Sequence, residues 1–267
     1  MKSAVLGLSL LACSVCAQAK IVTKTVPYDQ GGVHFIGYLA YDDAQTEGQK
    51  SPGVLVFPEW WGLDDFVKGR AEALAKIGYV AFAADMYGEG QSTTDPKKAK
   101  ELVGPLYGKP LMVDRAKAAL GQLTASGLVD QSDLAAIGFC FGGAACQMLA
   151  YSGAPLKGIV SFHGALVPLP ADAAEKTHAK FLILQGELDP LVDKDQRAAF
   201  IKSLDDGKVD FQYLSYSGAV HAFMNPDADK ARAAGLQGVG YNAAVAQRAW
   251  NQMQLFFKEI FGTVKTS

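Results

Sequence analysis

Residues 134–143 read Leu-Ala-Ala-Ile-Gly-Phe-Cys-Phe-Gly-Gly, and this stretch decides the fold. The apolar run 134–139 predicts a buried strand, residues 142–151 predict a helix, and Cys140 stands between them. Glycines two positions before and after Cys140 match the G-x-[S/C]-x-G nucleophile elbow, a tight turn that lifts one side chain above a sheet. The helix N-terminus favours a thiolate there, and the backbone N–H of Phe141 is free to bind an oxyanion. A small buried cysteine packed beside glycines is the alternative.

Apolar runs of strand length alternate with helical patterns along the rest of the chain. Strands are expected at 53–57, 79–84, 134–139, 158–162, 180–184 and 209–214, and helices at 64–77, 109–126, 142–151, 194–204 and 241–260. Because the strands are apolar on both faces, they predict a mostly parallel, doubly wound α/β sheet with helices on both faces. No linker rich in Pro and Ser interrupts the series, so residues 20–267 are expected to form a single domain.

The composition excludes several classes of protein. Of 267 residues, 49% are hydrophobic and the formal net charge is −2, which excludes a disordered chain. Lys and Arg form no basic stripe, so no nucleic-acid partner is expected. No His, Cys and Asp cluster has metal-ligand spacing, and neither a P-loop nor a dinucleotide fingerprint is present, so no metal or cofactor is expected.

The first 19 residues have the three parts of a secretory signal peptide. Lys2 precedes an uncharged stretch, residues 3–16, and the small residues Ala17-Gln18-Ala19 follow. We therefore expect cleavage before Lys20 and secretion, to a bacterial periplasm, without a membrane contact afterwards. A short membrane anchor and a lipoprotein anchor at Cys13 are the alternatives.

Two further loops at the carboxyl ends of predicted strands carry reactive side chains. Asp189 and His221 follow the last two strands of the series. Because such loops meet at one edge of a doubly wound sheet, Asp189 can orient His221, and His221 can face Cys140. The chain order nucleophile, acid, base is that of the α/β-hydrolases. The alternatives are a helix N-cap at Asp189, a role that Asp193 suits better, and a surface histidine.

Three motifs together resemble those of a known family. Besides G-x-C-x-G-G at 138–143, the chain has Phe-Pro-Glu-Trp-Trp-Gly at 57–62 and Asp-Met-Tyr-Gly at 85–88. In these segments it resembles the dienelactone hydrolase family, which uses a cysteine nucleophile, and the resemblance extends from about Val33 to the last helix. It implies the α/β-hydrolase fold.

The resemblance also implies roles for three residues. Glu59 would contact the resting Cys140 and help to take up its proton, the backbone N–H of Trp60 would be the second oxyanion donor, and Tyr87 would line the pocket. The residues themselves support the first role, because a carboxylate beside two tryptophans is poorly solvated, so its pKa should rise. A solvated loop glutamate is the alternative.

Further side chains at this edge are candidates for a substrate pocket. Trp61 belongs to the loop of Glu59, and Phe223 follows His221 closely. His163 follows the strand 158–162 at the same edge and could contact a substrate, although core hydrogen bonding is the favoured interpretation.

The resemblance has one departure. The enzymes that gave the family its name hold the substrate carboxylate with arginines, one after the Asp-Leu-Tyr segment and one shortly after the histidine. Here Gly-Glu-Gly at 88–90 and Ala-Phe-Met-Asn at 222–225 carry no cation. Since a bidentate arginine contributes much to carboxylate binding, a neutral or differently charged ester is expected at least as much as dienelactone.

These observations together predict a hydrolase that cleaves a small ester or lactone through a Cys-His-Asp triad and a thioester, as a monomer or weak homodimer. Cys140 and Cys146 are poorly spaced to form a disulfide bond, so both are expected as free thiols. Because two free thiols in an oxidising compartment could serve thiol exchange, one alternative is a periplasmic redox protein. The chain lacks C-x-x-C, however. The other alternative is a non-catalytic α/β-hydrolase binding module, which predicts a broken triad, whereas every triad residue type is present.

Overall fold

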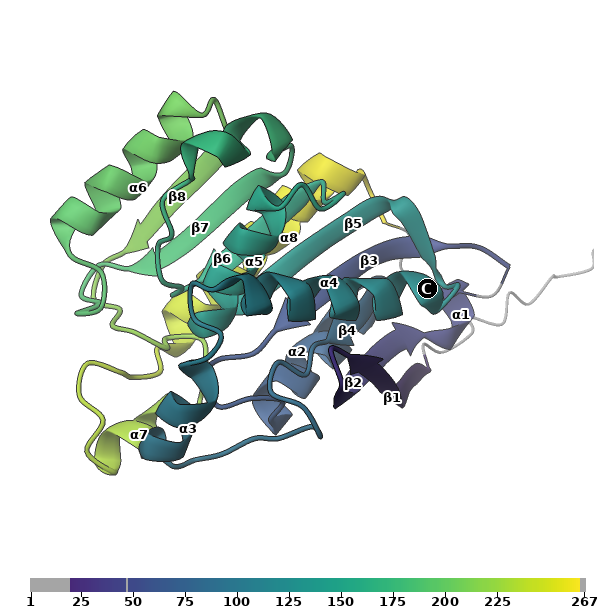
Figure 1. Cartoon of the computed structure of the whole chain (residues 1–267), viewed down its shortest axis with the longest axis horizontal. Helices are drawn as coiled ribbons and strands as arrows, with labels where there is room; N and C mark the ends of the chain where they lie inside the picture. The colour runs from purple at the N-terminus through teal and green to yellow at the C-terminus, as the bar shows by residue number, and fades with distance from the viewer. Residues whose placement is uncertain (1–19, 47, 265–267) are drawn as a thin grey trace, which may run out of the picture.

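The computed structural model describes residues 20–46 and 48–264, which form an α/β structure around one sheet of eight strands (Figure 1). The strand order is β1-β2-β4-β3-β5-β6-β7-β8. The strands are β1 (Ile21–Gln30), β2 (Val33–Asp42), β3 (Ser51–Phe57), β4 (Val80–Ala83), β5 (Val129–Phe139), β6 (Gly158–Phe162), β7 (Lys180–Gly186) and β8 (Phe211–Tyr216). The predicted signal peptide and its cleavage site at residues 1–19 lie outside the described residues.

Strands β3 to β8 are parallel to one another, as their apolar character predicts. The helices are α1 (Asp43–Thr46), α2 (Asp65–Ala75), α3 (Pro96–Val103), α4 (Pro110–Ala125), α5 (Phe141–Tyr151), α6 (Lys194–Asp206), α7 (Ala228–Ala233) and α8 (Ala243–Phe261), with a 3₁₀ helix at Ala171–Lys176. Within the part of the chain that the structure describes, no helix combines the length and apolar character needed to cross a membrane.

The two faces of the sheet bury separate cores because successive side chains of each strand point to opposite sides. In β3, Leu55 and Phe57 belong to the core that includes side chains of α4, α5 and α6, whereas Val54 and Val56 belong to the core that includes side chains of α2 and α8. Figure 1 shows α4 and α5 in front of the sheet and α2 and α8 behind it. The prediction of a mostly parallel, doubly wound sheet with helices on both faces is therefore confirmed.

The antiparallel hairpin of β1 and β2 at one edge of the sheet was not predicted. Gly31 and Gly32 form its turn with φ of 57° and 77°, values that suit a two-residue hairpin loop. Strand β1 is largely exposed. It therefore has no continuous apolar run of the kind that identifies the buried strands.

Candidate active site

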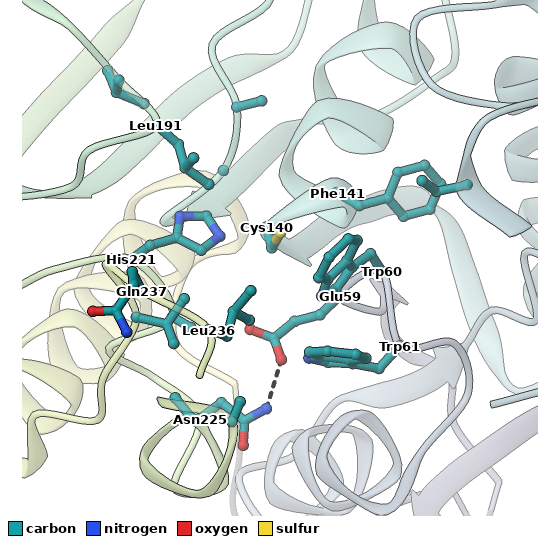
Figure 2. A pocket seen from close by; sticks show the side chains of 18 of the residues that line it. Glu59, Trp60, Trp61, Cys140, Phe141, Leu191, His221, Asn225, Leu236 and Gln237 are labelled. Carbon is teal, nitrogen blue, oxygen red and sulfur yellow. Dashed lines mark hydrogen bonds between the residues drawn. The ribbon is translucent and has the colours of Figure 1, made fainter. Parts of the chain in front are cut away.

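Cys140 stands in a sharp turn between β5 and α5, at the carboxyl edge of the sheet. Its backbone has φ 52° and ψ −114°, a strained conformation of the kind expected at a nucleophile elbow. Glycine is required on both sides, because a Cβ at Gly138 would lie 2.0 Å from the carbonyl oxygen of Gly142, and one at Gly142 would lie 2.5 Å from that of Phe57. The second contact brings the start of α5 against the end of β3. The sulfur faces the cavity shown in Figure 2.

His221 and Asp189 lie at the same edge and are joined directly. The Nδ1 of His221 is 2.8 Å from Oδ2 of Asp189, and both side chains are buried. In Figure 2 the other imidazole nitrogen points toward Cys140. Burial by itself would lower the pKa of His221, but Cys140 and Asp189 outweigh it and raise the pKa well above its usual value. The structure thus brings together the three residues that the sequence singled out as nucleophile, base and acid.

The carboxylate of Asp189 is held by three donors. Besides His221, Gln185 donates to Oδ2 at 2.9 Å and the backbone N–H of Leu191 donates to Oδ1 at 2.9 Å. Asp193 caps α6 and receives the N–H of Gln196 at 2.7 Å, as predicted for it in place of Asp189. Asp189 therefore does not cap the helix, and its carboxylate can orient the imidazole of His221.

Glu59 lies in the loop after β3 and is 3% exposed. Its Oε2 accepts a hydrogen bond of 2.5 Å from the side-chain amide of Asn225. The backbone N–H of Asp227 donates to the amide oxygen of Asn225, which fixes the amide orientation so that its nitrogen faces Glu59. Burial raises the pKa of Glu59 to about 7, against the opposing effects of Asn225 and His221. The carboxyl group can thus exchange a proton near neutral pH.

The two predicted oxyanion donors belong to residues that line the same cavity as Cys140. Phe141 is the first residue of α5, so its N–H has no acceptor within the helix. The carbonyl of Trp60 accepts a hydrogen bond of 2.7 Å from the hydroxyl of Tyr87, which fixes the backbone of Trp60. Tyr87 is itself held, because Asp85 accepts its backbone N–H and three further backbone N–H groups.

The cavity at Cys140 has a volume of about 470 Å³ and mostly apolar walls. Its lining residues are Glu59, Trp60, Trp61, Val103, Tyr107, Cys140, Phe141, Gly164, Ala165, Leu191, Val192, His221, Ala222, Asn225, Ala228, Ala231, Leu236, Gln237 and Val239. No Lys or Arg is among these described residues. The structure therefore agrees with the missing cations at 88–90 and 222–225.

The predicted pocket residues divide between the cavity wall and the layer behind it. Trp61 lines the cavity, whereas Tyr87, His163 and Phe223 do not. Tyr87 is turned to the Trp60 carbonyl, and Phe223 packs against Tyr216 beneath the sheet edge. His163 is fully buried, and neither ring nitrogen forms a hydrogen bond with any described residue, so the favoured interpretation of core hydrogen bonding was wrong.

Several lining residues were missed because they come from segments without a strong pattern. Tyr107 lies between α3 and α4, and Leu236 and Gln237 follow the short helix α7. Asn225 lies in the stretch 222–225, where a single amide has no spacing or neighbouring motif that indicates a role in the site. The described residues contain no group of three His, Cys, Asp or Glu side chains suited to a metal ion.

Known proteins are similar over nearly the whole described chain. The model of the dienelactone hydrolase family matches residues 35–261. A putative carboxymethylenebutenolidase of Aquifex aeolicus (strain VF5) is 30% identical over 244 residues, 88% of this chain and 97% of its own. A probable 2-oxo-3-(5-oxofuran-2-ylidene)propanoate lactonase of Bradyrhizobium sp is 27% identical, over 89% of this chain and 96% of its own.

A solved structure supports the same assignment. A dienelactone hydrolase-like promiscuous phosphotriesterase from metagenomic libraries is 40% identical, with a TM-score of 0.86, over 92% of this chain and 100% of its own. A structure titled m3DLH is 38% identical, with a TM-score of 0.85, over 90% of this chain and 99% of its own. These two structures confirm the predicted α/β-hydrolase-type fold. The chain therefore belongs to the dienelactone hydrolase family and is a carboxylic ester hydrolase of the dienelactone hydrolase-like kind.

Proposed function

We propose that the chain hydrolyses a neutral ester or lactone by acyl transfer to Cys140. The observation that carries this proposal is the alignment of three side chains at one cavity wall. Cys140 stands at the elbow, His221 faces it, and Asp189 holds His221 at 2.8 Å. The mostly apolar lining, with no cation among the described residues, favours a substrate without a carboxylate.

Acylation begins when the Cys140 thiolate attacks the ester carbonyl. The proton of the thiol goes either to His221, which becomes an imidazolium, or to Glu59, in which case His221 is an imidazolium from the start. The N–H groups of Trp60 and Phe141 stabilise the oxyanion. The bond between sulfur and carbon forms, the bond to the leaving oxygen breaks, and the imidazolium of His221 protonates that oxygen. The product of this half-reaction is a thioester.

Deacylation uses His221 a second time. The imidazole, oriented by Asp189, takes a proton from water, and the resulting hydroxide attacks the thioester and expels the thiolate. The leaving group of the ester matters in the acylation step. Because a thiolate is itself a good leaving group, the tetrahedral intermediate of acylation expels the thiolate again in preference to a poor alkoxide. Lactones, enol esters and aryl esters, which have better leaving groups, are therefore the favoured substrates, and amides are disfavoured.

The test compares the two cysteines of the described chain. Cys140→Ala should abolish the turnover of p-nitrophenyl acetate, whereas Cys146→Ala should retain it, since Cys146 is buried on α5. Mass spectrometry of the rapidly quenched enzyme should find the acetyl group on Cys140. Wild-type turnover by Cys140→Ala would overturn the proposal.

Thiol exchange is less well supported than hydrolysis. Exchange within the chain needs both cysteines to react, and burial raises the pKa of Cys146 well above its usual value, which keeps it as an unreactive thiol. A non-catalytic binding module is also disfavoured, because the arrangement of Cys140, His221 and Asp189 is complete.

A second candidate substrate class is a neutral phosphotriester. It is favoured by the solved structure titled a promiscuous phosphotriesterase, at 40% identity, and by a mostly apolar cavity whose described lining has no Lys or Arg. In this reaction the sulfur of Cys140 would bond to phosphorus and an aryloxide would leave. Turnover of paraoxon that is lost in Cys140→Ala would support it, and no turnover by the wild-type enzyme would exclude it.

We also propose that the signal-like residues 1–19 direct export to a bacterial periplasm. The support is the order of Lys2, the uncharged stretch and Ala17-Gln18-Ala19. Mass spectrometry of the protein expressed in a bacterium should find an N-terminus at Lys20. An intact N-terminus at Met1 would overturn this proposal, and a lipid-modified Cys13 would overturn cleavage before Lys20.

A further inference from the structure

His163 is a buried titratable residue that the proposed mechanism does not use. It directly follows β6 and has φ 41°, a left-handed backbone conformation that is uncommon for a residue other than glycine. Its ring is fully buried and packs edge-on against His221, with ring centroids 5.3 Å apart. Neither of its ring nitrogens forms a hydrogen bond with a described residue. Such a conformation and such an orphaned group persist where the surroundings impose them, typically at a functional site.

The Nε2 atom of His163 is close to the carboxyl group of Glu59. It lies 4.0 Å from Oε1 of the carboxyl group, while the other oxygen of Glu59 accepts the amide of Asn225. A movement of about 1 Å by the carboxyl group would bring Oε1 and Nε2 to hydrogen-bond distance. Glu59 therefore lies between two buried partners of different chemistry.

The two partners favour opposite protonation states. The amide nitrogen of Asn225 can only donate, so it stabilises the ionised carboxylate. A neutral His163 with its hydrogen on Nδ1 offers a lone pair at Nε2, which can only accept and so stabilises the protonated carboxyl. Burial, with a smaller effect from His221, lowers the pKa of His163 well below its usual value and keeps its ring neutral.

We propose that His163 is a positioning residue that accepts a hydrogen bond from protonated Glu59 during turnover, while Asn225 holds Glu59 in its ionised form. This inference rests on the proposed transfer of the Cys140 proton to Glu59. The S–H bond breaks and an O–H bond forms on Glu59, which then donates to Nε2 of His163. Glu59 keeps this proton while His221 gives its own to the leaving oxygen and regains one from water.

Three other titratable groups act on the pKa of Glu59. His221 lies on the loop after β8, Asp64 caps α2, and Asp227 precedes α7. The charge of His221 lowers the pKa of Glu59, and the charges of Asp64 and Asp227 raise it. None of these groups accepts a hydrogen bond from Glu59, so His163 is the acceptor that the geometry offers for the protonated form.

The test follows the protonation of Glu59 directly, in the enzyme without substrate. The infrared band of the protonated carboxyl is assigned by its loss in Glu59→Gln and is then titrated against pH. His163→Phe keeps an aromatic ring beside His221 but has no acceptor, so the titration should move down by about one pH unit. Asn225→Leu removes the donor and should move it up. His178→Gln, an exposed histidine before β7, should leave it in place.

Turnover supplies the second readout. With p-nitrophenyl acetate, His163→Phe should lower kcat by about tenfold, matching the weaker proton affinity of Glu59, and leave KM unchanged. His163→Asn, which tolerates the left-handed backbone, should give the same shifts if the Phe variant does not fold, because its shorter side chain does not reach Glu59.

Three outcomes would overturn the inference. The first is a pH midpoint of the Glu59 band that is unchanged in both His163 variants. The second is a midpoint that moves to higher pH, and the third is a midpoint that moves to lower pH while kcat is unchanged. Failure of the proposed function is distinguishable, because a wild-type enzyme that hydrolyses no ester would still show the band of Glu59 and its response to His163→Phe.

Discussion

The loops after β3 and β7 each place a buried carboxylate at the same edge of the sheet, but the two carboxylates have different surroundings. Asp189 accepts hydrogen bonds from Gln185, from the backbone of Leu191 and from His221. Glu59 accepts one side-chain hydrogen bond among the described residues, from Asn225. Because donors compensate a charge that burial would otherwise penalise, Asp189 is suited to hold a charge and Glu59 to exchange a proton.

The difference follows from how each loop is built. The loop after β7 turns back at once, so that Leu191 donates its backbone N–H to the carboxylate two residues earlier. The loop after β3 instead carries Trp60 and Trp61 beside Glu59, and their rings lie 4.9 Å apart. The faces of these rings are apolar, and Asn225 supplies the one side-chain hydrogen bond that Glu59 accepts among the described residues. The same edge of one sheet thus provides one fixed anion and one group with a pKa of about 7.

Asp189→Asn tests the fixed anion and has the largest expected effect. The amide can donate to Nδ1 of His221, which leaves the hydrogen on Nε2, where the imidazole must accept a proton. We expect kcat for p-nitrophenyl acetate to fall by about 10³- to 10⁴-fold, as in other triads. Asp193→Asn on the same loop is the control, because asparagine also caps helices well, and it should retain kcat. Equal losses in both variants would contradict the assignment of Asp189.

Glu59→Gln tests the proton-exchanging carboxyl through stability. The pKa of Glu59 is raised by burial from 4.5 to about 7, so the folded protein binds this proton more tightly than the unfolded chain. Below pH 4.5 the group is protonated in both states and costs nothing. As pH rises to about 7 the unfolded chain loses its proton first, and the protein loses about 3 kcal/mol of stability. The glutamine cannot ionise, so its variant should be more stable than the wild type by about that amount at pH 8 and equal to it at pH 4.5.

Urea unfolding at a series of pH values measures this difference. The control is Glu187→Gln, since Glu187 is an exposed carboxylate on the loop after β7 that pairs with Arg197 and Ser215. Its pKa is lowered, first by Ser215, so that variant should gain nothing at high pH. A Glu59→Gln variant no more stable than the wild type at pH 8 would show that Glu59 is ionised at little cost.

The parallel strands and the reactive residues could be predicted because both have strong local signals. Strands β3 to β7 contain apolar runs, Cys140 and Asp189 follow two of these strands, and His221 follows β8. The edge hairpin and the cavity wall from α7 have no such signal, since β1 is mostly exposed and α7 has six residues. The orientation of individual side chains could not be predicted from the sequence either, because it depends on contacts between segments that are distant in the chain.

Tyr87 illustrates that limit. The motif at 85–88 identified the segment, but the sequence could not show that Tyr87 turns away from the cavity to the carbonyl of Trp60, 27 residues earlier. Its role is therefore to hold the loop after β3, where no backbone N–H of a described residue donates to the Glu59 carboxylate as Leu191 does to Asp189.

Tyr87→Phe tests this support and has the smallest expected effect. The variant keeps the ring but frees the carbonyl of Trp60, so the backbone N–H of Trp60 is held less firmly toward the oxyanion. Since losing a whole oxyanion donor costs about 10²- to 10³-fold in kcat, loosening one should cost about tenfold and leave KM unchanged. Tyr151→Phe is the matched control, because its hydroxyl also donates to a backbone carbonyl, that of Val167 at 2.8 Å, away from Trp60. A raised KM with normal kcat in Tyr87→Phe would instead mean that Tyr87 touches the substrate, as the family resemblance implies.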